Sequence, residues 1–294
     1  MNIIDYAQSL TDGILFGAIY ALIGIGFTLI FGVMDRHNIA FAGSAFAGAY
    51  VSYALTIYLP LPAILVFLIA ALSSGMIGYI TYFCCFKFVP KEYPFASLLA
   101  SIGALMVIEE IIIHSTNGLP QTYISVFPYA YFEIGEFFGL RGDLIFIFGL
   151  ALLVTVILVY VLYKTKFGIA TRAVAQKPVA AQLCGISVEK TNSLVFVTAG
   201  FIGGLAGAMT SASIGLLSPM LILPFTVKGL IVTVIGGLGS IPGAIIAGLM
   251  LGGFENVFMA LRGVTERDMY VMLLLFVFLI FRPQGLFSNS VNRD

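Results

Sequence analysis

The sequence is divided into a series of long apolar stretches, and this pattern limits the fold more than any other feature. A helix that crosses the hydrocarbon core of a bilayer needs about 20 predominantly apolar residues. Apolar stretches occur at 13–34, 39–58, 62–86, 94–114, 144–163, 193–216, 225–259 and 269–281. Only 10% of the residues are charged, whereas soluble domains average about 25%. The sequence therefore predicts an all-α polytopic membrane protein in which residues 1–294 form a single transmembrane domain.

The stretch 225–259 is unusually long and is interrupted by glycine and proline. The interruption consists of Gly236, Gly237, Gly239, Pro242 and Gly243. Non-helical backbone is tolerated at membrane depth only where it is packed inside protein or lines a cavity. The stretch is either one broken helix or two shorter segments, so the sequence predicts eight or nine spans.

The distribution of basic residues predicts the orientation of the chain. The segment 164–192 contains five basic residues and one acid, whereas 115–143 contains one basic residue and three acids. Cytoplasmic loops carry an excess of Lys and Arg, so 164–192 is predicted to be cytoplasmic and 115–143 to be outside. The first residues include Asp5 and Asp12 but no Lys or Arg, which does not fit a cleaved signal peptide. We therefore expect the N-terminus outside and the C-terminus in the cytoplasm, which favours the odd number of spans.

Small residues recur every four positions in three of the spans. The sets are Gly13 and Gly17, Gly200 with Gly204 and Ala208, Gly203 and Gly207, and Ala244 with Gly248 and Gly252. Such spacing lets helix backbones approach closely in membranes. These faces are predicted to be packing seams, within the chain or between subunits.

Missing motifs argue against several kinds of chemistry. No G-x-x-x-x-G-K-[ST] loop occurs, so the chain is not expected to bind ATP itself. Cys84, Cys85 and Cys184 lack metal-ligand spacing, and no Ser/His/Asp arrangement or H-E-x-x-H supports an intramembrane protease. The net charge is zero, which provides no basic field for nucleic acid. We expect a non-enzymatic membrane subunit with no cofactor and no metal of its own, and no nucleic-acid partner.

The cytoplasmic segment 163–193 is too long for a tight turn and too apolar for a solvated linker. Pro178 fits the first turn of a short helix from about 178 to 184, and Gly185 fits its end. A short helix rich in small residues suits docking into a groove of another protein. The pattern fits equally well a surface helix that only connects two spans.

A longer motif in this segment resembles a known family. The residues Gly168-x-x-x-Arg172-Ala173-x-Ala175-x-x-Pro178-x-x-Ala181-x-x-x-Gly185-Ile186 are similar to the cytoplasmic loop of permease subunits of branched-chain amino acid ABC importers. Further similar stretches are GILFGAIYALIGIGFTLIFGVM at 13–34, GLIVTVIGGLGSIPGAIIAG at 229–248 and RPQGLF at 282–287. The resemblance implies an H-type (LivH-type) subunit whose coupling helix sits in a cleft of an ATPase. The coupling residues would be Arg172, Ala173, Ala175, Pro178, Ala181, Gly185 and Ile186.

The resemblance also implies an assembly in the cell inner membrane. Two ATP-binding cassette subunits would bind ATP and magnesium, and a second permease subunit would share the lipid bilayer with this chain. An extracytoplasmic substrate-binding protein would deliver leucine, isoleucine, valine or a related small amino acid or amide.

One motif departs from the family pattern. After the first span the family usually carries Asn-x-Ala-His-Gly-Glu, whereas this chain has Asn38-Ile39-Ala40-Phe41-Ala42-Gly43. If the missing histidine and acid contact substrate or gate the path, the cargo or the gating of this chain differs. The residues predicted to line the translocation path are Asn38, Ala40, Gly43, Gly236, Gly237, Gly239, Pro242, Gly243 and Glu255.

Ionisable residues within spans need a reason, because each costs at least ~2.5–3.5 kcal/mol to insert. Glu255 is predicted either to face the bundle interior or to lie at the membrane interface. Lys228 is expected to snorkel to the interface. Glu109, Glu110 and His114 are interpreted as an interfacial cap rather than a proton relay.

Two main functional hypotheses follow. The first is a permease subunit of an ATP-driven importer. The second is a self-contained ion-coupled secondary transporter or channel with the broken segment and Glu255 at its centre. The second hypothesis leaves the basic cytoplasmic loop unexplained. A structural subunit without a transport path would leave the glycine and proline break unexplained.

Overall fold

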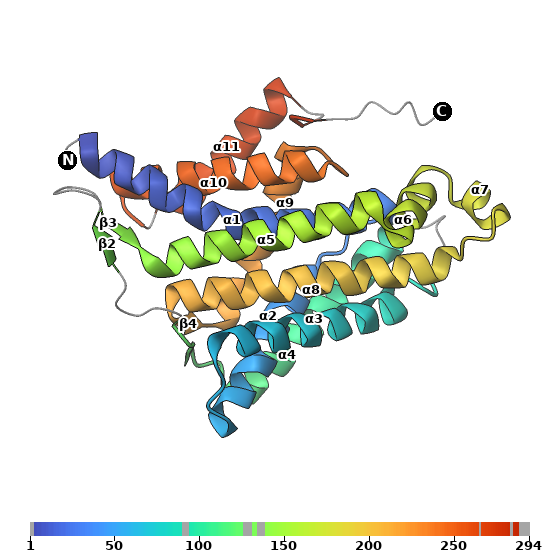
Figure 1. Ribbon diagram of the computed structural model, residues 1–294, viewed down its shortest axis with the longest axis horizontal. Helices are drawn as coiled ribbons and strands as arrows, with labels where there is room; N and C mark the ends of the chain where they lie inside the picture. The colour runs from blue at the N-terminus through green and yellow to red at the C-terminus, as the bar shows by residue number, and fades with distance from the viewer. Residues whose placement is uncertain are drawn as a thin grey trace.

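The chain folds almost entirely into helices, several of which lie side by side along the long axis of the molecule (Figure 1). The computed structural model describes residues 3–89, 94–125, 131–133, 139–264, 266–282 and 285–287. The helices are α1 (Ile3–Met34), α2 (Ala40–Tyr58), α3 (Ala63–Cys85), α4 (Pro94–Thr116), α5 (Gly142–Lys164), α6 (Lys166–Gln176), α7 (Pro178–Leu183), α8 (Val188–Ile214), α9 (Ile222–Gly236), α10 (Ile241–Arg262) and α11 (Arg267–Phe281). A 3-10 turn η1 (Pro219–Leu221) and the short strands β1 (Gln121–Thr122), β2 (Tyr131–Glu133), β3 (Gly139–Arg141) and β4 (Leu216–Leu217) complete the described elements.

Eight helical segments in the described ranges are long and apolar enough to cross a membrane, if η1 is counted with α9. The predicted all-α polytopic fold is therefore confirmed. The break predicted within 225–259 separates two helices, α9 and α10, rather than kinking one. Helix α11 has 15 residues. At 1.5 Å per residue it spans about 22 Å, which is shorter than the ~30 Å hydrocarbon core.

Helix α11 nevertheless returns the chain along the bundle. The Leu286 backbone N–H donates to the Ile235 carbonyl oxygen at 2.8 Å, so the segment after α11 meets the end of α9. Helix α10 runs antiparallel to α1, because its start lies near the end of α1 and its later residues lie near the start of α1. Helix α11 is not one of the eight described spans, so the odd number of passes that the charge distribution favours stays a prediction.

Glycines bring two pairs of helices into backbone contact. In the α1–α10 pair, a Cβ atom placed on Gly13 would lie 2.5 Å from the Gly252 carbonyl oxygen. In the α3–α8 pair, a Cβ atom on Gly200 would lie 2.7 Å from the Ser74 carbonyl oxygen. A side chain does not fit at either position, so the predicted seams are confirmed. Both seams pack within one chain and not between subunits.

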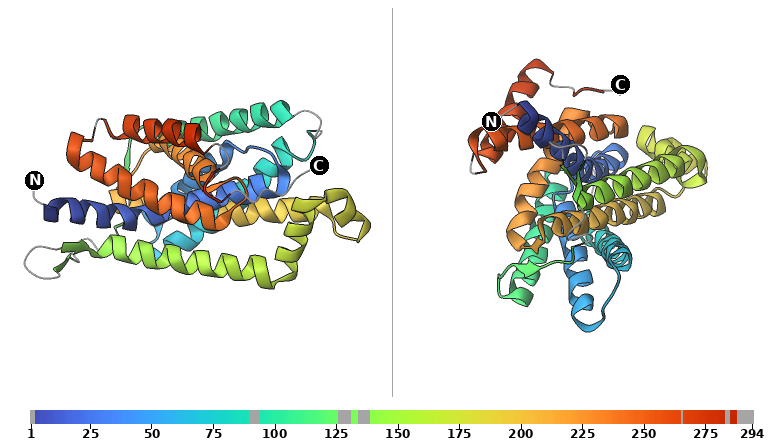
Figure 2. Two further views of the ribbon diagram at one scale, coloured as in Figure 1. Left: turned by 90° about the horizontal axis from the view of Figure 1, so that it is seen from above. Right: turned by 60° about the vertical axis from the view of Figure 1, so that its left-hand side comes forward.

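The helices differ in how much of their surface the rest of the chain covers. In α1, 78% of the most apolar window is buried, whereas in both α4 and α5 the share is 22%. The two less covered helices lie at opposite edges of the bundle seen from above (Figure 2). Their exposed apolar faces are suited to contact with lipid or another membrane subunit.

The two charged loops lie at opposite ends of the bundle. Helices α6 and α7 project from one end, and strands β2 and β3 lie at the other (Figure 1). Strand β1 pairs with β4, with Gln121 opposite Leu217, and so ties the loop after α4 to the end of α8. We call the end with α6 and α7 the inner end and the opposite end the outer end.

Candidate functional site

Two cavities open along helices α1 and α10, one at each end of the bundle. The outer cavity has a volume of about 460 Å³. The start of α1, the start of α5, the end of α8, the second half of α10 and the start of α11 line it. The inner cavity, of about 640 Å³, is lined by the second half of α1, the end of α5, α6 and the α9–α10 break. Between the cavities, α1 and α10 stay in backbone contact, with Gly17 packed against Gly248.

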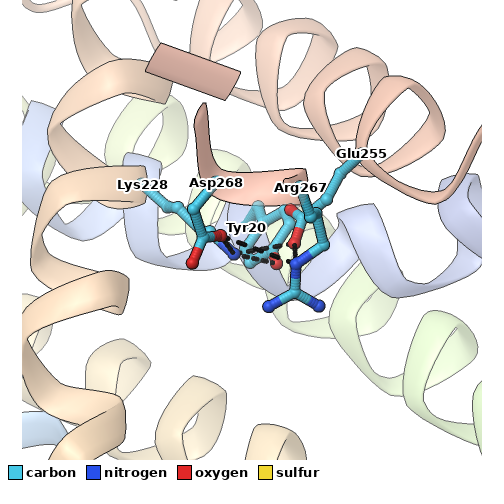
Figure 3. Close-up of polar contacts among 5 residues, drawn as sticks. All are labelled: Tyr20, Lys228, Glu255, Arg267 and Asp268. Atoms are coloured by element: carbon cyan, nitrogen blue, oxygen red, sulfur yellow. Dashed lines mark hydrogen bonds and ion pairs between the residues drawn. The ribbon is translucent and has the colours of Figure 1, made fainter. Parts of the chain in front are cut away.

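A cluster of ion pairs centred on two buried side chains, Lys228 and Glu255, lies at the outer cavity (Figure 3). We define the outer ion cluster as Tyr20, Lys228, Glu255, Arg267 and Asp268. Glu255 Oε1 lies 2.7 Å from Lys228 Nζ and 2.9 Å from Arg267 Nε. The Lys228 and Glu255 side chains are only 5% and 4% exposed.

The rest of the outer ion cluster completes the surroundings of Lys228. Its Nζ lies 3.2 Å from Asp268 Oδ1 and donates a hydrogen bond to the Tyr20 hydroxyl at 3.3 Å. Buried charges are tolerated when they are paired and hydrogen-bonded, and removing one partner strands the other. The cluster therefore holds the start of α11 against α9 and α10 from residues of four helices.

The structure decides two of the alternatives raised by the sequence. Glu255 faces the bundle interior. The expectation that Lys228 snorkels to the interface was wrong, because Glu255 lies within reach and makes the buried position tolerable. Tyr20, Arg267 and Asp268 were not predicted from the sequence as site residues. The available signal was the presence of opposite charges on both sides of a helix break, at Lys228 and Glu255.

A second ion pair, between Arg141 and Asp143, also lies at the outer cavity, where Arg141 is a lining residue. Arg141 approaches both oxygens of Asp143, with Nη2 at 2.6 Å from Oδ2 and Nε at 3.2 Å from Oδ1. The same Nη2 donates to the Ser213 carbonyl oxygen at 3.0 Å. Asp12 also lines this cavity. The outer cavity is therefore a polar chamber with both signs of charge on its walls.

The α9–α10 break forms one wall of the inner cavity. Ser240 caps α10 by accepting from the Gly243 backbone N–H at 3.2 Å, and Pro242 stands in the first turn of α10, where proline is favoured. Gly237 and Gly239 have φ values of +100° and +84°, which side chains other than glycine rarely adopt. Gly236 packs directly on the backbone of Gly243.

The inner cavity brings the break together with part of the predicted coupling loop. Arg172 and Ala175 on α6 line it together with Gly239 and Pro242. Arg172 lies over the Tyr163 ring, 5.2 Å from its centroid. Two sets of residues that the sequence assigned to separate tasks thus share one chamber.

The remaining predicted coupling residues do not form one surface. Ala181 is buried, Pro178 and Ile186 are half-buried, and Gly185 stands at the end of α7 with φ +83°. The large apolar side chains that α7 exposes are instead Val179, 71% exposed, and Leu183, 86% exposed. Neither residue was among the predicted coupling residues.

The predicted path residues near the start of α2 lie apart from both large cavities. Asn38 is buried and lines a space of about 30 Å³ beside the end of α9. Ala40 is buried, and a Cβ atom on Gly43 would lie 2.7 Å from Leu105 Cδ1 of α4. Phe41 packs edge-on against Phe27, with ring centroids 4.8 Å apart. In this structure Gly43 is a packing position between α2 and α4.

Glu109, Glu110 and His114 of α4 do not form a proton relay with one another in the described part of the chain. Glu110 and His114 are exposed and Glu109 is half-buried. No hydrogen bond or ion pair links these side chains to one another within the described parts of the chain. Among those residues there is also no group of three or more His, Cys, Asp or Glu placed to hold a metal ion.

The similarity to a known family extends along nearly the whole chain. Residues 9–281 match the model of the family described as branched-chain amino acid transport system, permease component. The chain belongs to this family. The permease is therefore a multi-pass membrane protein and a non-catalytic transport subunit, and its membership supports the importer hypothesis and not the self-contained transporter.

Three relatives show how far the similarity extends. The branched-chain amino acid permease protein BraD of Pseudomonas aeruginosa is 26% identical over 301 residues, covering 98% of this chain and 97% of that protein. The LivH permease protein of Escherichia coli is 25% identical, covering 97% of this chain and 96% of that protein. A probable LivH permease protein of Methanocaldococcus jannaschii is 30% identical, covering 84% of this permease and 79% of its relative.

Proposed function

We propose that this permease is the membrane subunit of an ATP-driven importer for leucine, isoleucine and valine, or for closely related small amino acids or amides. The names of the relatives support the substrate class. The observation that carries the mechanism is the inner cavity, whose walls combine the α9–α10 break with α6, the helix that precedes α7 in the cytoplasmic loop. A force applied to that loop from the inner end would act directly on the break.

The mechanism follows from what α7 presents to the inner end. Val179 and Leu183 are apolar, exposed and held on a short helix, which suits docking in a groove of an ATPase subunit. When two ATPase subunits close on ATP and magnesium, α7 and α6 would shift together because Lys177 alone separates them. The wall formed by Arg172 and Ala175 would then move against Gly239 and Pro242. The cavities would exchange between outward and inward access as a two-state system.

The other partners belong to different faces of the permease. The outer end, with β1 paired to β4, would receive an extracytoplasmic substrate-binding protein. A second permease subunit and lipid would cover the exposed apolar faces of α4 and α5. No ATP, magnesium or other cofactor is assigned to this chain.

Co-purification and reconstitution test this proposal. The tagged permease, solubilised gently from its native membrane, should carry one or two ATPases and a second permease subunit that are identified by mass spectrometry. The reconstituted assembly should take up labelled leucine only with ATP and the binding protein. Recovery of the permease alone after mild cross-linking would contradict the assignment.

A matched pair of variants tests the role of α7. Leu183→Glu should abolish ATP-dependent uptake, because a carboxylate would enter the apolar docking surface. Leu183→Met is the control, since it keeps an apolar side chain of similar volume at the same exposed position. It should retain most of the uptake. Equal loss in both variants would argue against a docking role for α7.

A further inference from the structure

The outer cavity combines two carboxylates and two guanidinium groups around one volume. Asp12 and Glu255 supply the negative charges, and Arg141 and Arg267 supply the positive charges. A chamber of about 460 Å³ has room for a small organic molecule. Groups of opposite charge facing a common space are suited to a ligand that carries both charges itself.

The acidic groups retain unused hydrogen-bonding capacity. Glu255 Oε1 makes both ion pairs of this side chain, whereas Oε2 is buried and has no hydrogen-bond partner in the described parts of the chain. Asp12 Oδ1 is likewise buried and without such a partner there. A buried polar atom left without a partner costs free energy, so these two oxygens call for a donor.

The two arginines differ in what they have to offer. Arg141 is held by Asp143 and the Ser213 carbonyl oxygen. Arg267 uses its Nε toward Glu255, and its two terminal nitrogens point away from Glu255 and Asp268 (Figure 3). Those two nitrogens form a planar fork of the kind that binds a carboxylate through two parallel hydrogen bonds.

We propose that the outer cavity is a binding site for the zwitterionic backbone of an α-amino acid. The terminal nitrogens of Arg267 bind the ligand carboxylate, and Asp12 and Glu255 Oε2 accept from the ligand ammonium group. This inference rests on the proposed function and deepens it, because it gives the permease its own recognition of the cargo in addition to that of a binding protein.

Apolar residues of the same cavity complete the site. Phe16, Leu144, Ile214 and Met259 line it beside the charged groups. A ligand held by its two backbone charges would place its side chain among these residues. Aliphatic side chains would gain from leaving water there, so the site predicts amino acids with apolar side chains as ligands.

The absence of tryptophan from the sequence allows a direct binding test. Phe16→Trp would place the only tryptophan of the chain in the wall of the outer cavity. The full-length variant in lipid nanodiscs is titrated with leucine, with leucinamide, which lacks the carboxylate, and with isocaproate, which lacks the ammonium group. The proposal predicts a saturable fluorescence change with leucine and a far weaker response to both analogues. No change with leucine, or equal responses to all three, would overturn the proposal.

Variants on the same background assign the charges. Arg267→Gln should raise the half-saturating concentration of leucine by about tenfold or more, because a charge-assisted contact is lost. Arg267→Lys keeps a positive charge beside Glu255 and should have a smaller effect. Arg262→Gln is the control, since Arg262 is exposed and does not line the cavity.

A second variant protects the test against misfolding. Asp12→Asn should also weaken leucine binding, while its response to isocaproate should rise relative to that of leucine. Asp12 is only half-buried, so this change leaves the packing intact. Unchanged leucine binding in both Asp12→Asn and Arg267→Gln would overturn the proposal even if both proteins fold.

Uptake by the reconstituted importer separates this inference from the proposed function. If the wild-type assembly imports leucine and Arg267→Gln leaves the KM and kcat of import unchanged, the site is wrong and the function stands. If the wild-type assembly imports no amino acid, the proposed function itself fails. A raised KM in Arg267→Gln, together with the fluorescence result, supports both.

Discussion

The two cavities of the permease are built from different materials. Charged side chains from several helices wall the outer cavity, and long-range ion pairs such as Lys228–Glu255 hold them in place. The wall of the inner cavity at the break is backbone, formed by glycines and Pro242. Ion pairs can be exchanged for contacts with a charged ligand, whereas a glycine-rich turn can change its φ and ψ angles. We infer that the outer cavity binds the cargo, whereas the backbone around the inner cavity changes conformation during transport.

The largest expected effect comes from a substitution at the break beside the inner cavity. Gly243→Val should prevent accumulation of folded permease, because its Cβ atom would meet the carbonyl group of Gly236, which is backbone and cannot move aside. Overpacking of this kind costs about 3 kcal/mol or more. Size-exclusion chromatography of the tagged protein in detergent measures the folded fraction. Gly149→Val is the control, since nothing lies within 4 Å of the added atom, and it should elute normally.

The next largest effect is expected from a substitution in the outer ion cluster. Glu255→Leu should destabilise the permease by about 3 kcal/mol, because it leaves Lys228 and Arg267 with Asp268 alone. The double variant Lys228→Met, Glu255→Leu should be more stable than the sum of the two single changes predicts, because it removes both buried charges. Thermal unfolding in detergent provides the comparison. Additive losses would show that the two charges do not depend on each other.

These two regions also show what the sequence could and could not predict. Pro178 and Gly185 bounded α7 correctly, because the start and end of a short helix depend on neighbouring residues. The apolar stretches likewise predicted the spans, because a span depends on a run of consecutive residues. The outer ion cluster was not predicted as a unit, since it joins residues that are up to 248 positions apart, from Tyr20 to Asp268.

The path residues illustrate the same limit. The predicted translocation path joined Asn38, Gly239 and Glu255, yet they lie in three different places: beside the end of α9, at the inner cavity and at the outer cavity. A linear motif states which residues a family shares, and it does not state which of them meet. That the break and α6 share a cavity follows only from the packing of α1, α5 and α10.

A smaller effect sharpens the role of the break. Gly239→Ala should destabilise the permease by about 1–2 kcal/mol, because its φ of +84° is unfavourable for a residue with a Cβ atom. If the break moves during transport, the uptake rate should fall by more than the loss of folded permease explains. Gly103→Ala in α4 is the control with the opposite sign, since nothing lies near the added atom and alanine favours the helix. Equal uptake in both variants would argue against a moving break.

The smallest effect sharpens the role of the outer ion cluster. Asp268→Asn should change stability by less than about 1 kcal/mol, because the Asp268 side chain is 57% exposed and solvent screens its ion pairs. The contrast with Glu255→Leu isolates burial as the cause of the larger effect. A loss in Asp268→Asn as large as that in Glu255→Leu would show that the cluster acts as one unit.

If the two cavities are alternately accessible ends of one path, the access of water to each cavity should alternate. Thiol labelling measures that access. Cys84, Cys85 and Cys184 are first replaced by serine or alanine, and a single cysteine is then placed at Phe16 in the outer cavity or at Thr28 in the inner cavity. The assembled importer is labelled with a small water-soluble thiol reagent, without nucleotide and with a non-hydrolysable ATP analogue. Alternating access predicts that the nucleotide changes the two labelling rates in opposite directions. Rates that do not respond to nucleotide, or that rise and fall together, would contradict it.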